Sequence, residues 1–204
     1  MPATVNSLKR RAHEQLDYSL FRYEKARLDQ LDQALLRWIA SMTAVEIYGI
    51  WERYAEERLK VALVNYPAQF LADNNITGMR TIPVGLANVL LRERMKYFDF
   101  RSMDDLISKS DRLVGRNHNP FRSLTPTVRN YLDTLSDIRN FIVHQSDHSL
   151  RNYRRRLVGL YGLRSFSYPT VILNSIDRRP GSPTRNQPRI TGLIKTVGDA
   201  VRRS

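Results

Sequence analysis

The stretch from Ala26 to Leu63 contains no proline and a single glycine, and this constrains the fold more than any other feature of the sequence. Apolar residues recur along it at intervals of three and four positions, at Leu28, Leu31, Leu35, Trp38, Met42, Val45 and Gly49. In a helix with 3.6 residues per turn, this spacing lines them up on one face. The stretch therefore predicts one long core helix with an apolar seam, and an all-α bundle built around it.

The seam ends on an acidic residue. Three positions after Gly49 comes Glu52, directly after Trp51, where another apolar residue would continue the pattern. Burying a carboxylate costs free energy unless the charge is paired. We therefore expect Glu52 either to pair with an arginine such as Arg53 or Arg139, or to take part in a site.

Four later segments carry helix signals. Pro83 is suited to a first helical turn and predicts a helix to about residue 97, and Ser102 with Asp105 resembles a capping box that opens a helix to about residue 113. "GRNHNPF", which contains His118, is expected to be a loop. Thr125-Pro126 then opens a helix to about residue 145, and Ser146 or Asp147 caps another over residues 148–162.

The last part of the chain differs in composition. We expect a helical domain over residues 1–165 with its core at about 26–160, an extended segment and linker over residues 166–189, and a C-terminal helix over residues 190–204 that forms a basic appendage. "SFSYPTVILN" favours a strand or an extended packed segment, and "DRRPGSPTRNQP" a mobile linker. The C-terminal helix could dock on the domain or on a partner.

Charge is concentrated in the same part. Residues 1–138 hold 20 Lys and Arg against 17 Asp and Glu, a net +3, whereas residues 139–204 hold 13 against 3, a net +10. Such a surface favours a polyanionic partner such as RNA, because cationic contacts to phosphates release condensed counterions. The plain alternative is a solvated basic tail.

Several classes of protein are disfavoured by composition. The chain has no cysteine and only four scattered histidines, so we expect neither a metal site nor a cofactor. No run approaches the roughly 18 apolar residues of a membrane span, and the first residues lack the apolar core of a signal peptide. We therefore expect a cytoplasmic location and no membrane partner.

The basic region begins at a polar motif on an apolar helix, Arg139-Asn140-Phe-Ile-Val-His144. Asn140 and His144 are four positions apart and share a helix face, and the long side chain of Arg139 can reach across to them. Among 27 arginines and four histidines, this Arg-to-His spacing is expected by chance about half a time, but requiring the asparagine lowers the expectation to roughly 0.03. The asparagine is therefore what makes the pattern informative.

These three residue types suit metal-free cleavage of RNA. That reaction needs a base for the 2′-hydroxyl proton, an acid for the leaving 5′-oxygen, and a cation beside the crowded phosphate. One chain supplies a single histidine in this context. A two-fold homodimer that juxtaposes two such helix ends would supply two histidines and two arginines, so the chemistry predicts a dimer.

The motif Arg139-Asn140-x-x-x-His144, preceded by a long helix with "IWERY", resembles the HEPN superfamily, and in particular its ribonuclease-L-like and prokaryotic toxin and defence branch. The resemblance covers residues 26–160. It implies an antiparallel helical bundle that dimerises through the motif-bearing helices, a metal-independent endoribonuclease, and action as a toxin or phage-defence effector with a possible antitoxin or other defence partner.

Roles are implied for individual residues by the same resemblance. Arg139 would stabilise the phosphate and His144 would act as acid or base. Asn140 would have a positioning role, and Glu52 would support the site. Ser146 stands where the branch regulated by a nucleotidyltransferase antitoxin has a tyrosine, so that mode of regulation is not implied. From the residues themselves, we assign RNA-backbone binding to the dense cationic patch after the motif, namely Arg151, Arg154, Arg155 and Arg156.

Two other readings stay open at this stage. The first is a non-catalytic HEPN-like subunit that binds nucleotide or nucleic acid, or dimerises within a larger complex. The second is a basic helical DNA-binding regulator, for which the sequence has no obvious helix-turn-helix signature. For two residues a purely structural role is the alternative to a functional one. His144 can interact with the end of its own helix, and Glu52 can pair with an arginine within the bundle.

Overall fold

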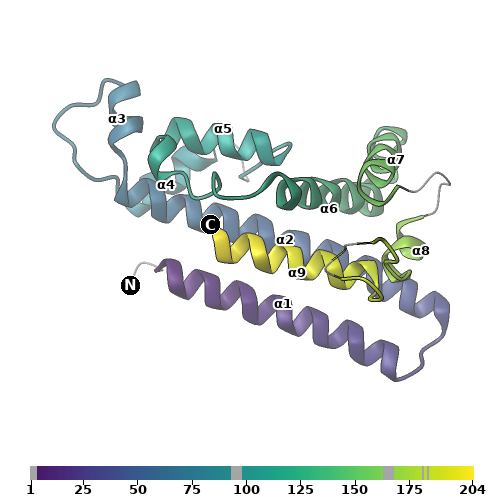
Figure 1. Ribbon diagram of the computed structural model, residues 1–204. Helices are drawn as coiled ribbons and strands as arrows, with labels where there is room; N and C mark the ends of the chain where they lie inside the picture. Colours follow the sequence, from purple (N-terminus) through teal and green to yellow (C-terminus); the bar gives the residue numbers. More distant parts are fainter. Residues whose placement is uncertain (1–3, 93–97, 163–167, 181, 183) are drawn as a thin grey trace.

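The computed structural model describes residues 4–92, 98–162, 168–180, 182 and 184–204. Within these ranges the chain forms nine α-helices and one short 3-10 helix, with no β-strand (Figure 1). The expectation of an all-α fold is confirmed. The helices of the core run along one another in an elongated bundle.

The first two helices form a long antiparallel hairpin, with α1 at Val5–Leu28 and α2 at Gln33–Asn65 (Figure 1). The prediction of one unbroken helix from residue 26 to residue 63 was wrong at its start. Gln30 adopts a left-handed conformation with φ of 52°, and the Asp32 carboxylate caps α2 by accepting hydrogen bonds from the backbone N–H groups of Ala34 and Leu35, at 2.8 and 3.0 Å.

The predicted seam is not the buried face of α2. Trp38 is 58% exposed and Met42 is 38% exposed, and Leu28 at the end of α1 is 80% exposed. The side chains of α2 that are buried lie on other faces, at Leu36, Ala40, Ala44, Ile47, Trp51, Tyr54 and Leu59. Because α1, α4, α6, α8 and α9 all pack against α2, apolar residues surround most of this helix and periodicity alone does not identify its inner side.

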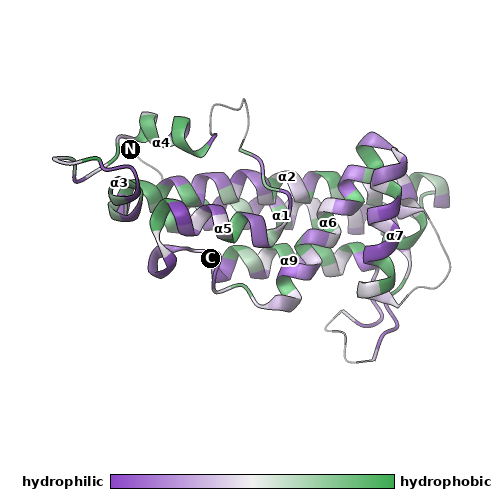
Figure 2. Ribbon diagram, turned by 90° about the horizontal axis from the view of Figure 1, so that it is seen from above, coloured by the Kyte–Doolittle hydropathy of each residue, from purple (hydrophilic) through white to green (hydrophobic). Residues whose placement is uncertain are grey.

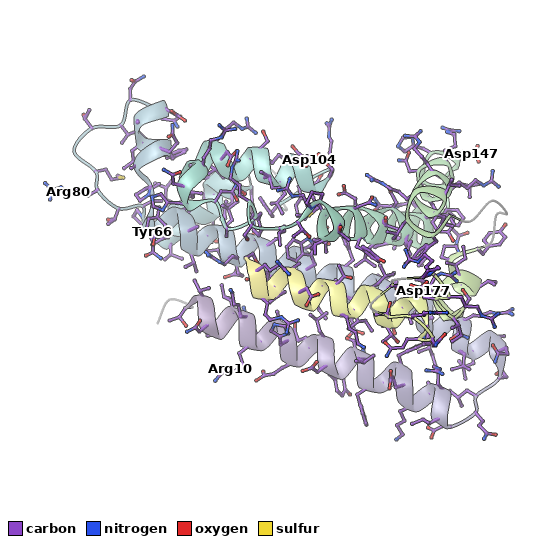
Figure 3. All side chains as sticks on the ribbon, viewed as in Figure 1. Arg10, Tyr66, Arg80, Asp104, Asp147 and Asp177 are labelled. Atoms are coloured by element: carbon purple, nitrogen blue, oxygen red, sulfur yellow. The ribbon has the colours of Figure 1, made fainter. Side chains whose placement is uncertain are left out.

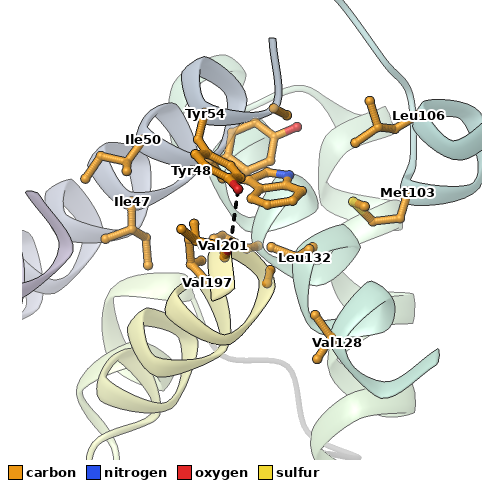
Figure 4. Packing of buried hydrophobic residues seen from close by; sticks show 14 of the residues in the cluster. Ile47, Tyr48, Ile50, Tyr54, Met103, Leu106, Val128, Leu132, Val197 and Val201 are labelled. Carbon is orange, nitrogen blue, oxygen red and sulfur yellow. Dashed lines mark hydrogen bonds between the residues drawn. The ribbon is translucent and has the colours of Figure 1, made fainter. Parts of the chain in front are cut away.

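The C-terminal helix α9 (Arg189–Arg203) packs along the hairpin and contacts α1, α2 and α6. Its apolar face is fully buried, with Leu193, Val197 and Val201 at 1% exposure or less. In Figure 4, Val197 and Val201 meet Ile47 and Tyr54 of α2, and the Tyr54 hydroxyl donates to the Val201 carbonyl oxygen at 3.1 Å. The predicted helix is present, but it is part of the core rather than a basic appendage.

Between the hairpin and the motif-bearing helix lie three helices, α3 (Ala68–Asp73), α4 (Val84–Leu91) and α5 (Met103–Val114). Pro83 precedes α4, and the expected extension of that helix toward residue 97 lies mostly outside the described residues. The Ser102 hydroxyl accepts from the Asp105 N–H at 3.2 Å, so the predicted cap of α5 is confirmed. The expected loop after α5 contains one 3-10 turn, η1 (Arg116–His118).

The motif lies on α6 (Pro126–His144), which is followed at once by α7 (Asp147–Tyr161). Thr125 caps α6 as the sequence predicts, and Ser146, one of the two predicted candidates, caps α7. Gln145 between them is left-handed with φ of 48°, and it turns the chain so that α7 crosses the end of α6. In Figure 2, much of the α7 ribbon has the colour of hydrophilic residues.

The segment predicted to be a strand or extended is helical where it is described, as α8 (Pro169–Asn174), whose end is held by a hydrogen bond from the Tyr23 hydroxyl to the Asn174 side chain. The expected linker packs on the bundle, because Asp177 is 1% exposed and Arg179 donates to it at 2.6 and 2.9 Å (Figure 3). Arg179 also donates to the Leu160 carbonyl and the Tyr131 hydroxyl. None of the helices in the described ranges could cross a membrane by length and hydropathy.

Candidate functional site

Arg139 and Asn140 lie on the last turns of α6 and are joined directly. Arg139 Nη1 donates to Asn140 Oδ1 at 2.9 Å, and both side chains are half-buried. The Arg139 Cζ atom also lies 5.9 Å from the centroid of the Tyr48 ring on α2. The amide therefore restricts the guanidinium, which makes no other hydrogen bond to the residues that the structure describes.

Glu52 approaches this arginine from α2. Burial raises the pKa of the Glu52 carboxyl, and the negative charge of Asp99 acts in the same direction, whereas the positive charge of Arg139 opposes the shift. Within the described ranges no ion pair of 4 Å or less joins Glu52 to Arg139. The structure thus brings the two predicted residues within electrostatic reach of each other, without the close pairing expected of a simple salt bridge.

Tyr48 and Ser136 complete the surroundings of the arginine. Burial raises the pKa of the Tyr48 hydroxyl well above its usual range, and the same hydroxyl interacts with Ser136 and with the charges of Glu52 and Arg139. Sequence reasoning missed both residues. The signal was present, because Tyr48 lies one helical turn before Glu52 and Ser136 lies one turn before Arg139.

His144 is the last residue of α6 and is exposed to solvent. Its imidazole makes no hydrogen bond to any of the described residues, and Asn140 lies one turn before it on the same helix. The structure therefore joins Arg139 to Asn140 and brings Arg139 near Glu52, but among the described residues it does not join His144 to any of them. The imidazole is accessible to a ligand or to a second protein chain.

The four arginines assigned to RNA binding have different surroundings. Arg156 forms ion pairs with Asp133 at 3.4 Å and Asp137 at 3.0 Å, so it ties α7 to α6. Arg151, Arg154 and Arg155 are exposed on α7. The outer face of α7 is thus cationic and follows the motif directly, while Arg156 has a structural role that the sequence prediction did not assign to it.

No model of a known protein family, no curated protein and no solved structure matches this chain. Among the residues that the structure describes, no three histidine, aspartate or glutamate side chains converge on a point where they could hold a metal ion. What the site can do is therefore inferred from its own chemistry. It offers a cation hydrogen bonded to an amide, an accessible imidazole one turn after that amide, and a basic helix that follows.

Proposed function

We propose that this protein is a metal-independent endoribonuclease of the HEPN type that acts as a homodimer in the cytoplasm, as a toxin or as a phage-defence effector. One observation carries the proposal. Asn140 accepts a hydrogen bond from Arg139 at 2.9 Å on the helix that ends in the exposed His144, so the motif residue that made the pattern informative also orients the arginine. A preorganised cation and an accessible imidazole on the same helix end are groups that cleavage of RNA can use.

In the proposed reaction, the 2′-oxygen attacks the adjacent phosphorus as a base removes its proton. The bond from phosphorus to the 5′-oxygen breaks as an acid protonates that oxygen, which leaves a 2′,3′-cyclic phosphate and a 5′-hydroxyl. Arg139 neutralises charge on the phosphate. His144 of one chain serves as base and His144 of the second chain as acid, because each chain contributes one accessible imidazole to the site.

The RNA backbone would be held by the outer face of α7. Arg151 and Arg155 are exposed there, close in sequence to the motif, and arginine side chains bind phosphates strongly. Arg156 is excluded from this role in the proposal because its guanidinium is committed to Asp133 and Asp137. The proposed RNA-binding face therefore includes fewer arginines than the four-arginine patch that the sequence predicts.

The test is cleavage of a structured RNA in the presence of EDTA. We expect products with cyclic phosphate and 5′-hydroxyl ends, and a loss of rate of about 100-fold or more in His144→Ala, since general acid-base catalysis contributes on that scale. Arg139→Ala is expected to be similarly impaired. His148→Ala is the matched control, because this exposed histidine lies four positions later and its ring meets the Asn152 amide at 3.1 Å.

The outcome also decides between this function and the alternatives. If the wild-type protein binds RNA but leaves it intact at high protein concentration, a non-catalytic nucleic-acid-binding subunit replaces the proposal. If it binds duplex DNA in preference to RNA, a DNA-binding regulator does so. Equal cleavage by the wild type and His144→Ala would remove His144 from the mechanism.

A further inference from the structure

Large apolar side chains are exposed together on the α1–α2 hairpin. Tyr18 on α1 is 59% exposed, and Leu35, Trp38 and Met42 on α2 are 39%, 58% and 38% exposed. The Arg22 guanidinium connects the two helices, because it lies over the Tyr18 ring at 4.9 Å and pairs with Glu46 of α2. Tyr18, Leu35, Trp38 and Met42 are called the hairpin patch below.

The size of the hairpin patch fits a protein interface. Large side chains bury about 150–250 Å² each, so the exposed fractions of these four correspond to about 400 Å² of mostly apolar surface. Apolar atoms make up roughly 60% of an interface, so with its polar rim the patch would bury about 700 Å² on this chain. A stable dimer of standard size buries about 800 Å² per partner.

The surface around Trp38 is complementary to itself. A hollow of about 440 Å³ is lined by Trp38, Ile39, Met42 and Thr43, with Arg22 and Glu46 also in its wall. The wall thus carries the Arg22–Glu46 ion pair beside an indole that is largely exposed. In a two-fold interface the same surface is used by both copies, so an exposed indole beside a hollow allows each copy to offer its indole to the hollow of the other.

The hairpin patch is also continuous with the candidate site. Along α2, Trp38 and Met42 are followed at helical spacing by Val45, Gly49 and Glu52, which lie on the same face of the helix. Glu52 is the residue within electrostatic reach of Arg139. One face of α2 therefore leads from the exposed indole to the residues of the proposed half-site.

We infer that a second copy of this chain docks on the hairpin patch, with α2 of one copy against α2 of the other. The choice of a second copy rests on the proposed function, since the reaction needs a second His144. It also rests on the area and on the self-complementarity of the patch. The docking would cover Trp38 and place two half-sites at the same dimer interface.

The test measures molecular mass by light scattering at micromolar concentration for the wild type, Leu35→Glu and Trp38→Glu. We expect a dimer for the wild type and a rise in Kd of about 100-fold or more for each variant, because each change acts twice in a two-fold interface. Leu86→Glu is the matched control. Leu86 is also a leucine at the third position of its helix, α4, and it is 40% exposed against 39% for Leu35.

Each result has one meaning, provided that circular dichroism shows the variants to be folded. A monomeric wild type overturns the inference, and so does a dimer that Leu35→Glu and Trp38→Glu leave intact. Dissociation by Leu86→Glu to the same extent also counts against it. RNA cleavage is read separately: a wild type that dimerises through the patch but does not cleave RNA upholds the interface and refutes the proposed nuclease.

Discussion

The substitution Leu193→Ala tests whether α9 is part of the core. The Leu193 side chain is 1% exposed on the face of α9 that meets the hairpin and α6. Truncating a buried leucine to alanine removes its transfer free energy and leaves a cavity, which together cost about 3 kcal/mol when the surroundings do not collapse. For a chain of this size, that loss corresponds to a decrease in Tm of about 6–12 °C.

The measurement is thermal and urea unfolding followed by circular dichroism, with all proteins at one concentration because dimerisation would raise the apparent stability. Leu86→Ala on α4 serves as the control, since Leu86 is 40% exposed and its truncation should cost less than about 1 kcal/mol. If Leu193→Ala lowers Tm no more than Leu86→Ala does, α9 does not stabilise the bundle and our account of the core is refuted.

Three further predictions concern charged groups. Asp177→Asn should lower the free energy of unfolding by about 3 kcal/mol at neutral pH in chemical denaturation, because it breaks a buried pair with Arg179. Since the pKa of the Asp177 carboxyl is lowered in the native state, the difference between variant and wild type should shrink as the pH falls below the usual pKa of an aspartate. Glu52→Gln should unfold at a higher temperature than the wild type at neutral pH. Because the pKa of Glu52 is raised in the native state, this residue's contribution to stability falls as pH rises above the ordinary glutamate range. A Tm that depends on pH more steeply in the variant than in the wild type would contradict this. Arg156→Ala should destabilise the protein by about 1–2 kcal/mol in thermal melts, since two half-buried carboxylates on α6 lose their partner, whereas Arg155→Ala at an exposed position should change little.

The sequence predicts elements best where their signals are local. The caps of α5, α6 and α7 depend on a hydroxyl and the backbone N–H groups of the next turn, so Ser102 and Thr125 were sufficient to predict two of them, and the third was narrowed to Ser146 or Asp147. The break between α1 and α2 has a local signal in the Asp32 cap of α2, but one aspartate does not by itself mark a break in an apolar helical pattern. Gln30 and Asp32 are compatible with a continuing helix, and the chain turns there because α1 gains its partners, α2 and α9, by folding back.

The candidate site was predictable in part for the same reason. Arg139 and Asn140 are neighbours in sequence and hydrogen bond, and Glu52 was noticed because it interrupts an apolar pattern. The role of Arg156 depends on Asp133 and Asp137, which are one turn apart on another helix, so it required the packing of α7 against α6. The catalytic roles of Arg139 and His144 stay predictions.

The position of α9 has a consequence for how the chain reaches its native state. The helix completes a core begun by α1, so contacts that close the bundle join segments from opposite ends of the described chain, and such distant contacts slow folding. At synthesis rates of roughly 5–20 residues per second, the hairpin would wait about 7–28 seconds on the ribosome before α9 is complete. During that interval the groove that receives Leu193 and Val197 would be open, which makes the nascent hairpin a substrate for chaperones that bind exposed apolar surface.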